Sequence, residues 1–296
     1  MKSESLYEYI TLRRNQHTVH AMCRVLHVSE SGYYRSEHRT AGVKPWQLLL
    51  VKIREIYAET PDNRNYGIRR IQLALDQRGI HVSRSGVRRA MKRGGLLKAA
   101  PHRAASLTRA DAAAQKAENL IHRDFSAQMP NQKWLMDITQ IPCVDGKLCI
   151  AAVLDCYNGE IVGLAMDNNM KKDLCIQAFR SACQTQGASG MILHSDRGSQ
   201  FTSVEFRKVL AQYGAIQSMS GTGHCYDNAR MEGFFATLKK EKLYQLYTEK
   251  LPMAQVKSIV FRYIMTYYNR QRIYTANPPN GLPPAMFRQA ARGLAA

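Results

Sequence analysis

Three carboxylates stand inside segments built for strands or helices, and their placement constrains the fold more than any other feature. Asp137 ends the apolar run Trp134-Leu135-Met136, and Asp196 follows the short apolar run Met191-Ile192-Leu193. Glu232 begins a helical pattern in which apolar residues recur with a period near 3.6. A carboxylate embedded among strand-forming residues is costly to bury unless its charge is compensated. We therefore expect three separate elements to bring these acids to one cation.

Carboxylates that converge from several elements can bind a hard divalent cation. Mg²⁺ takes carboxylate oxygens and keeps positions open for water and phosphate. Two such ions about 4 Å apart can clamp the attacking and leaving oxygens of an in-line displacement at phosphorus. We predict that Asp137, Asp196 and Glu232 are both the catalytic residues and the metal ligands, and that the cofactor is two Mg²⁺ ions, with Mn²⁺ as a substitute. A surface or capping role explains one acid alone, but not all three together.

The chain is strongly basic, with a formal net charge of +19 and an isoelectric point near 9.8. A charge of this size indicates a polyanion as the partner. The charge is uneven, because residues 1–130 hold 23 Lys and Arg against 11 Asp and Glu. We therefore expect the strongest contacts with nucleic acid in the first half, ahead of the acids.

At the acids the chain resembles a DDE transposase with a retroviral-integrase-like core. It is similar to the downstream-frame (OrfB-type) protein of bacterial insertion sequences whose transposase comes from two overlapping frames. The segments that carry the resemblance span nearly the whole chain: Asn131-Gln132-Lys133-Trp134, His194-Ser195-Asp196-Arg197-Gly198, Gly223-His224-Cys225-Tyr226-Asp227-Asn228-Ala229 with Glu232 and Lys239, Tyr267-Tyr268-Asn269-Arg270, and Gly281-Leu282-Pro283-Pro284-Ala285-Met286-Phe287. One departure is Arg270-Gln271-Arg272-Ile273-Tyr274, where relatives carry Arg-Arg-x-His-Ser.

The resemblance implies DNA transposition as the activity. Water would cut a strand at the terminal inverted repeats to leave a 3′-hydroxyl, which then attacks a phosphodiester of the target DNA. The partners implied are duplex DNA, further copies of the chain in a synaptic homo-oligomer, and the upstream-frame protein as a fusion. Lys239 and Lys240 would position the DNA backbone, since Lys239 lies two helical turns after Glu232 on the same face. Asn228 would contact DNA or, as an equal alternative, cap the helix.

The first hundred residues are predicted to be helical. We expect residues 1–60 to form an N-terminal helix-turn-helix region, with Ser29 capping a helix, and residues 61–100 to form a second helix-turn-helix unit that binds DNA. Guanidinium groups suit phosphates and guanine edges. The predicted DNA contacts of this unit are Arg69, Arg70, Arg84, Arg88 and Arg89, with a solvated basic face as the alternative for the last three.

Residues 101–130 lack a long apolar period and predict a basic linker, and residues 131–296 predict the catalytic core with a C-terminal helical tail. Three hairpin strands should precede alternating helices and strands. This pattern predicts an α/β, ribonuclease H-like core, with a mixed five-stranded sheet and flanking helices, preceded by small all-α helix-turn-helix units. Asp155, also on a strand, is a further ligand candidate, although pairing with an arginine or capping a turn explains it better.

The seven cysteines show no C-x-x-C pair, and neither a signal peptide nor a long apolar span is visible. These features predict an intracellular, reduced protein that is not associated with a membrane. The resemblance implies a bacterial cytoplasmic protein associated with the nucleoid. Two rival functions remain. A ribonuclease H-like nuclease would keep the acids but would need no pair of helix-turn-helix units. The other rival is a non-catalytic, sequence-specific DNA-binding protein, either a repressor or an inactive or partial transposase. A repressor would keep the N-terminal half but would have no reason to hold three acids at this spacing.

Overall fold

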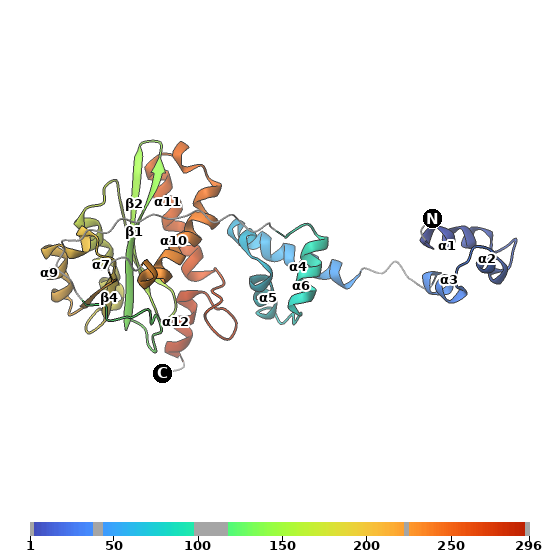
Figure 1. Ribbon diagram of the computed structural model, residues 1–296, viewed down its shortest axis with the longest axis horizontal. Coiled ribbons are helices and arrows are strands. Elements are labelled where there is room, and N and C mark those ends of the chain that lie inside the picture. Colours follow the sequence, from blue (N-terminus) through green and yellow to red (C-terminus); the bar gives the residue numbers. More distant parts are fainter. Residues whose placement is uncertain (1–2, 38–43, 98–117, 222–224, 294–296) are drawn as a thin grey trace. The chain divides into compact units, whose positions relative to one another are not determined.

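The computed structural model describes residues 3–37, 44–97, 118–221 and 225–293 (Figure 1). Its contacts divide the chain into two compact units, Met1–Val51 and Lys52–Ala296. The predicted domain boundaries near residues 60, 100 and 130 remain predictions. Most of the predicted linker, residues 101–117, lies outside the described residues.

The first unit contains short helices whose starts are capped by hydroxyl side chains. Gly32 N donates to Ser29 Oγ at 3.1 Å, which confirms the predicted serine cap. A small apolar core of Ile10, Met22, Cys23 and Tyr33 holds the helices together. Their bounds are α1 Ser3–Arg13, α2 Val19–Val25 and α3 Glu30–Glu37.

The predicted pair of helices after residue 61 is present. Ser83 Oγ accepts a hydrogen bond from Gly86 N at 3.2 Å and caps the second of them. Apolar residues recur at helical spacing on the facing sides, where Ile71 and Leu75 of one helix and Val87 and Met91 of the other are buried. The elements of this region are α4 Pro45–Glu59, the 3-10 helix η1 Pro61–Asn65, α5 Ile68–Asp76 and α6 Arg84–Arg93.

Within the described part of the chain, five strands form one mixed sheet in the order β3-β2-β1-β4-β5. The first three are antiparallel neighbours, and β4 runs parallel to both β1 and β5. Gly146 turns the chain from β1 into β2 at φ +131°, a conformation that side-chain-bearing residues avoid. The strands are β1 Lys133–Cys143, β2 Gly146–Asp155, β3 Ile161–Asp167, β4 Ile192–Ser195 and β5 Ile216–Met219.

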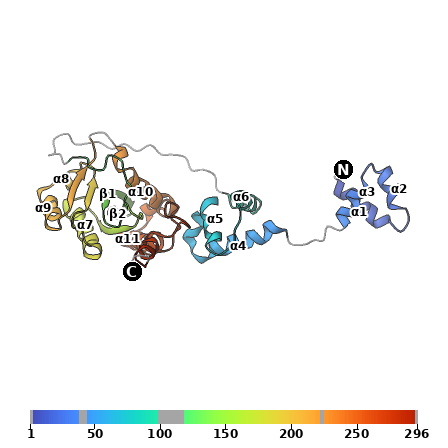
Figure 2. The same cartoon turned by 90° about the horizontal axis from the view of Figure 1, so that it is seen from below.

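Helices cover both faces of this sheet, as Figures 1 and 2 show. On one face Trp134 and Met136 of β1 pack with Phe179 among α7 Lys172–Gln186, α8 Ser199–Thr202 and α9 Val204–Gln212. The other face carries α10 Ala229–Glu241 and α11 Met253–Arg262. Eight successive residues of β2 are buried, as expected for a strand covered on both sides. The predicted fold class, a mixed five-stranded α/β core after helical units, is confirmed.

Short helical segments complete the second unit: the 3-10 helices η2 Cys225–Asn228, η3 Leu243–Gln245 and η4 Thr248–Lys250, the π-helix η5 Tyr263–Tyr268, and α12 Pro284–Gly293. None of the helices among the described residues has the length and apolar character to cross a membrane.

A buried ion pair fastens α12 to the end of β2. Arg288 Nη2 lies 2.6 Å from Asp155 Oδ2, and Arg288 Nε lies 2.7 Å from Glu160 Oε2. Tyr157 N also donates to Asp155 Oδ1 at 2.9 Å and closes the turn after the strand. The prediction that Asp155 pairs with an arginine and caps a turn is therefore confirmed.

Candidate active site

Two of the three predicted acids lie side by side on neighbouring parallel strands. Asp137 stands in the middle of β1, and Asp196 follows the last residue of β4. In the register between these strands Leu135 lies opposite His194. Continuing that register by two residues places Asp137 opposite Asp196, because parallel strands advance in step.

The third acid reaches the same place from a helix. Glu232 lies in the first turn of α10, which packs against β1. Asn228 Nδ2 donates to Met136 O at 3.3 Å and ties the start of α10 to β1 beside Asp137. The structure therefore brings together the three acids that the sequence places on separate elements.

The other two acids influence the ionisation of Asp137. Burial, together with the negative charges of Asp196 and Glu232, raises the pKa of Asp137 to about 7, although Ile138 N donates to its Oδ1 at 2.8 Å. Burial also raises the pKa of Asp196, against a hydrogen bond from Gly198 N. The pKa of Glu232 is raised by burial as well. Like charges gathered in a poorly hydrated place disfavour ionisation until a cation joins them.

The residue types fit Mg²⁺, a hard cation that takes carboxylate oxygens. Among the described residues, no three His, Cys, Asp or Glu side chains are close enough to enclose an ion. Glu232 is exposed, whereas Asp137 and Asp196 are half-buried. The acids thus border an open site and do not form a closed cage. Their metal-binding and catalytic roles remain predictions.

Lys239 shares this site. Burial lowers its pKa, and the negative charge of Asp137 opposes the change, so the ammonium group and that carboxylate lie within electrostatic reach. Lys240, the next residue, is exposed. The side chain of Asn228 does not cap α10, which disfavours the capping alternative. Its Oδ1 atom is buried and has no hydrogen-bond partner among the described residues.

A cavity of about 400 Å³ extends from Lys239 along the side of β1. Two exposed tyrosines, Tyr244 and Tyr247, line it, and the sequence did not identify them as candidates. Their only signal was position, since aromatic side chains just after a basic helix can stack on bases. The lining residues are Gln140, Ile141, Pro142, Lys239, Leu243, Tyr244, Tyr247, Thr248 and Glu249.

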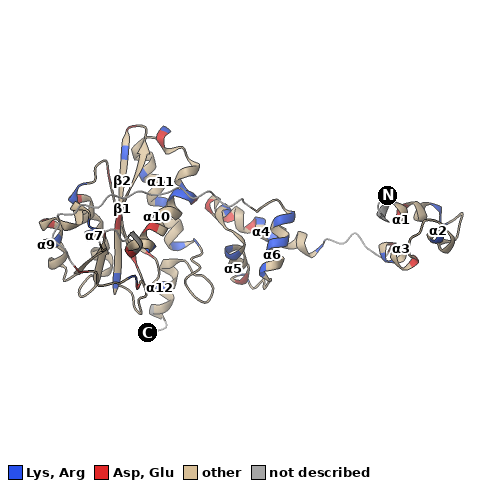
Figure 3. Cartoon of the chain, in the orientation of Figure 1, with Lys and Arg blue, Asp and Glu red and all other residues tan. Residues whose placement is uncertain are grey.

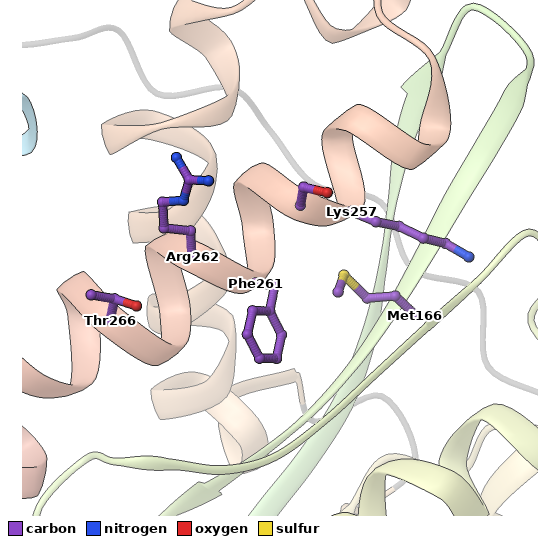
Figure 4. A pocket seen from close by; sticks show the side chains of 6 residues that line it. Met166, Lys257, Phe261, Arg262 and Thr266 are labelled. Carbon is purple, nitrogen blue, oxygen red and sulfur yellow. The ribbon is translucent and has the colours of Figure 1, made fainter.

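A second cavity, of about 450 Å³, is lined by none of the predicted residues (Figure 4). It lies between β3 and the helices α11 and η5. Its lining residues include Met166, Lys257, Phe261 and Arg262. Of these two cavities, the first includes Lys239 in its lining and the second does not.

Two buried residues position the site without belonging to the predicted set. Asp227 accepts hydrogen bonds from Asn119 Nδ2 at 3.0 Å, Gly221 N at 2.9 Å and Arg123 Nε at 2.8 Å, which anchors the approach to α10. His194 contacts Ser218 Oγ at 2.8 Å and Ser220 Oγ at 3.1 Å, and burial lowers its pKa to about 4. The histidine is therefore neutral and braces the strand that ends at Asp196.

The predicted DNA-binding arginines fall into two groups. Arg69, Arg84, Arg88 and Arg89 are exposed, and Figure 3 shows Lys and Arg gathered on α6. Arg70 instead forms an ion pair with Glu241, with 2.9 Å between Nη1 and Oε1, and only 22% of its side chain is exposed. Contact with DNA remains a prediction for all of them.

Comparison with known proteins finds family models that match three stretches of the chain. The family model described as "Integrase core domain" matches residues 127–225, a second model of the same description matches residues 232–291, and "HTH-like domain" matches residues 45–104. A solved structure of the HTLV-2 integrase catalytic core domain in complex with magnesium has a TM-score of 0.40 and 20% identity, and the match covers 54% of this chain and 98% of that one.

Relatives of similar length come from insertion sequences. The IS600 uncharacterized 31 kDa protein of Shigella sonnei is 35% identical over 93% of this chain and 100% of its own length. Transposase InsF for insertion sequence IS3A of Escherichia coli is 30% identical over 95% of this chain and 97% of its own. With an integrase core, an HTH-like domain and relatives that match from end to end, the chain belongs to the family of insertion-sequence transposases.

Proposed function

We propose that this protein cuts DNA at the ends of an insertion sequence and joins the cut strands to a target DNA. The observation that carries the proposal is the meeting of Asp137, Asp196 and Glu232 beside Lys239. The charges of Asp196 and Glu232 disfavour the ionisation of the half-buried Asp137, which a bound cation would favour, and a basic chain with a cationic side chain at the same place fits a phosphate substrate.

Different residues of the site bind the metal ions and position the DNA. Asp137, Asp196 and Glu232 would hold two Mg²⁺ ions, for which Mn²⁺ could substitute, and the bound ions would supply positive charge that stabilises the oxygens around the reacting phosphorus. Lys239 and Lys240 hold the phosphate backbone, and the buried Asn228 orients the strand beside Asp137. In the first step a water oxygen forms a bond to phosphorus, and the 3′ oxygen leaves and takes up a proton. In the second step that 3′-hydroxyl attacks a target phosphodiester, whose own 3′ oxygen leaves.

Assembly completes the proposal. The first half of the chain binds the terminal inverted repeats through Arg69, Arg84, Arg88 and Arg89, which are exposed. Two or more copies hold both ends in a synaptic homo-oligomer, since two ends must be joined to one target. Fusion to an upstream-frame protein adds further contacts with the ends, and the complex works on the chromosome in the bacterial cytoplasm.

The direct test uses end-labelled duplexes that contain the DNA flanking this reading frame. With Mg²⁺ the purified chain should nick these duplexes to leave a 3′-hydroxyl and should then join the labelled strand to a supercoiled plasmid. Duplexes of scrambled sequence are the control. The proposal would be contradicted if the folded chain left both the flanking duplexes and the plasmid intact, alone and when fused to the upstream frame.

Lys239→Ala should slow single-turnover cleavage by about ten- to a hundredfold, equivalent to about 1.4 to 2.7 kcal/mol. The ammonium group lies near Asp137 and lines the adjoining cavity, so its removal takes away a backbone contact but no metal ligand. The loss should be greatest on short duplexes, which offer few other contacts. Lys257→Ala is the matched control, because Lys257 is also half-buried but lines the other cavity. Equal rates for both variants would make Lys239 a solvated lysine.

Charge reversal at Arg88 and Arg89 should weaken duplex binding by the full-length chain. Both side chains are exposed on α6, and each lost phosphate contact should reduce the log–log dependence of affinity on salt by about 0.9. Fluorescence anisotropy between low and moderate salt measures this slope. The paired control is Lys171→Glu with Arg180→Glu, which makes the same charge change at exposed positions of the catalytic core. An equal loss in both variants would show a general charge effect and no binding role for α6.

A further inference from the structure

The helix-turn-helix region is fastened to the far end of the helix that carries Glu232. Asn65 Nδ2 donates to Glu241 O at 2.9 Å, and Lys242 Nζ donates to Asp62 Oδ1 at 2.9 Å. Arg70 Nη1 lies 2.9 Å from Glu241 Oε1. Asp62, Asn65 and Arg70 on one side and Glu241 and Lys242 on the other are called the polar clasp.

Glu241 anchors the clasp on the core side. Arg272 donates to its two carboxylate oxygens from Nε and Nη2, both at 2.8 Å, and Tyr263 OH donates to Oε2 at 2.9 Å. Burial acts to raise the pKa of Glu241, but the hydrogen bonds from Arg272 outweigh it and keep the pKa below its usual range. A charged group that is buried among several partners strongly resists displacement, because losing one partner leaves a charge without compensation.

Further contacts extend the attachment along α5. Ile273 N donates to Tyr66 OH at 3.0 Å, and Gln77 Nε2 donates to Asn280 O at 2.8 Å. These two contacts lie at opposite ends of α5, so the helix is held along its length and cannot pivot about one point. The buried face of α5 packs in turn on α6, which carries Arg84, Arg88 and Arg89.

The two ends of α10 therefore serve different parts of the protein: Glu232 near the start belongs to the proposed active site, and Glu241 at the end belongs to the polar clasp. Glu232 lies nine residues before Glu241, about 13.5 Å along the axis at 1.5 Å per residue. We propose that the polar clasp joins α5, α6 and α10 into one rigid body, which sets the cut at a constant number of base pairs from the DNA segment that α6 contacts. The inference rests on the proposed function. A flexible connection would instead let the cut scatter over neighbouring phosphodiesters, because such linkers sample many separations.

Asp62→Lys tests the clasp by placing like charges together with Lys242. The ratio of cuts at the principal position to cuts at its neighbours should fall about tenfold, which corresponds to about 1.4 kcal/mol. The exchanged pair Asp62→Lys with Lys242→Asp should restore the ratio, since it restores the ion pair. Glu59→Lys is the matched control, because it makes the same charge change three residues away. Glu59 pairs with Arg78, which also lies in the helix-turn-helix region and not in the catalytic core. Cut positions are read at nucleotide resolution on full-length protein.

A second measurement changes only the DNA, so it does not depend on the folding of any variant. One or two base pairs are inserted between the cut site and the segment that the wild-type chain protects from hydroxyl radicals. The cut should stay at the same distance from the protected segment and should move away from the terminal sequence by the inserted length. A cut that follows the terminal sequence, or an Asp62→Lys protein that cuts with wild-type precision, would overturn the inference while leaving the proposed function in place. A wild-type chain that cuts none of the duplexes would overturn the proposed function, and this inference with it.

Discussion

Asp196→Asn should abolish strand cleavage and joining, with a loss of at least about a thousandfold, or about 4 kcal/mol. Asp196 lies beside Asp137 at the carboxyl end of β4, and the amide keeps the size of the side chain while removing the charge that a divalent cation requires. Binding to duplex DNA should be unchanged, because the basic contacts of α6 lie elsewhere in the chain. Single-turnover cleavage and anisotropy on the same duplex measure the two effects.

The control for this variant is Asp173→Asn, which makes the same chemical change at an exposed position in the first turn of α7. It should cut at the wild-type rate. Asp137→Asn and Glu232→Gln should fail as Asp196→Asn does, since each removes one of the three carboxylates proposed to bind the metal ions. An Asp196→Asn protein that still cuts element ends in Mg²⁺ would show that the site is assigned to the wrong residues.

Arg288→Met should destabilise the catalytic core by about 3 to 5 kcal/mol, the usual loss when one partner of a buried ion pair is removed. Asp155 and Arg288 are almost fully buried, with exposures of 0% and 3%, and Glu160 lies against the same guanidinium. The variant therefore leaves two carboxylates without their cation. Urea unfolding followed by the fluorescence of the buried Trp134, in a Trp46→Phe background, reports this core.

Arg180→Met provides the comparison, because Arg180 is exposed on α7 and its loss should change the free energy of unfolding by no more than about 0.5 kcal/mol. Combining Arg288→Met with Asp155→Asn should destabilise less than the sum of the two single variants, since the second change removes the charge that the first leaves unpaired. Strict additivity would mean that the pair of Asp155 and Arg288 contributes no coupling energy.

Local patterns predicted the elements and their class. The pattern of apolar segments after residue 131 predicts five strands, of which the first three are joined as hairpins and the last two alternate with helices. A glycine after Asp145 predicts the first hairpin, as the sheet shows. The pattern of residues predicted the helices around residues 68–93, because a buried helical stripe is a local property, whereas the Ser83 cap was found only in the structure. Asp137, Asp196 and Glu232 could be selected for a similar reason: each is an acid in a segment whose neighbours are apolar.

Local sequence patterns did not predict contacts between residues that are far apart in the chain. Arg70 and the arginines of α6 look alike in the sequence, yet Arg70 pairs with Glu241, 171 positions later, while Arg88 and Arg89 remain exposed. The cavity beside Lys239 likewise depends on where the chain after α10 returns to β1, so the position of Tyr244 and Tyr247 after a basic helix did not by itself show that they line it.

The sequence by itself determined the three acids, the basic first half, the order of strands and helices, and the family resemblance, because each of these is written in the residue types and their spacing. Only the tertiary structure decided which charges meet. Asp155 takes Arg288 as its partner and Glu241 takes Arg272 and Arg70, whereas Asp137 lies where the charges of Asp196 and Glu232 oppose its ionisation. The physical reason is that the free energy of a buried charge depends on the partners that folding places around it, and those partners come from positions far apart in the chain.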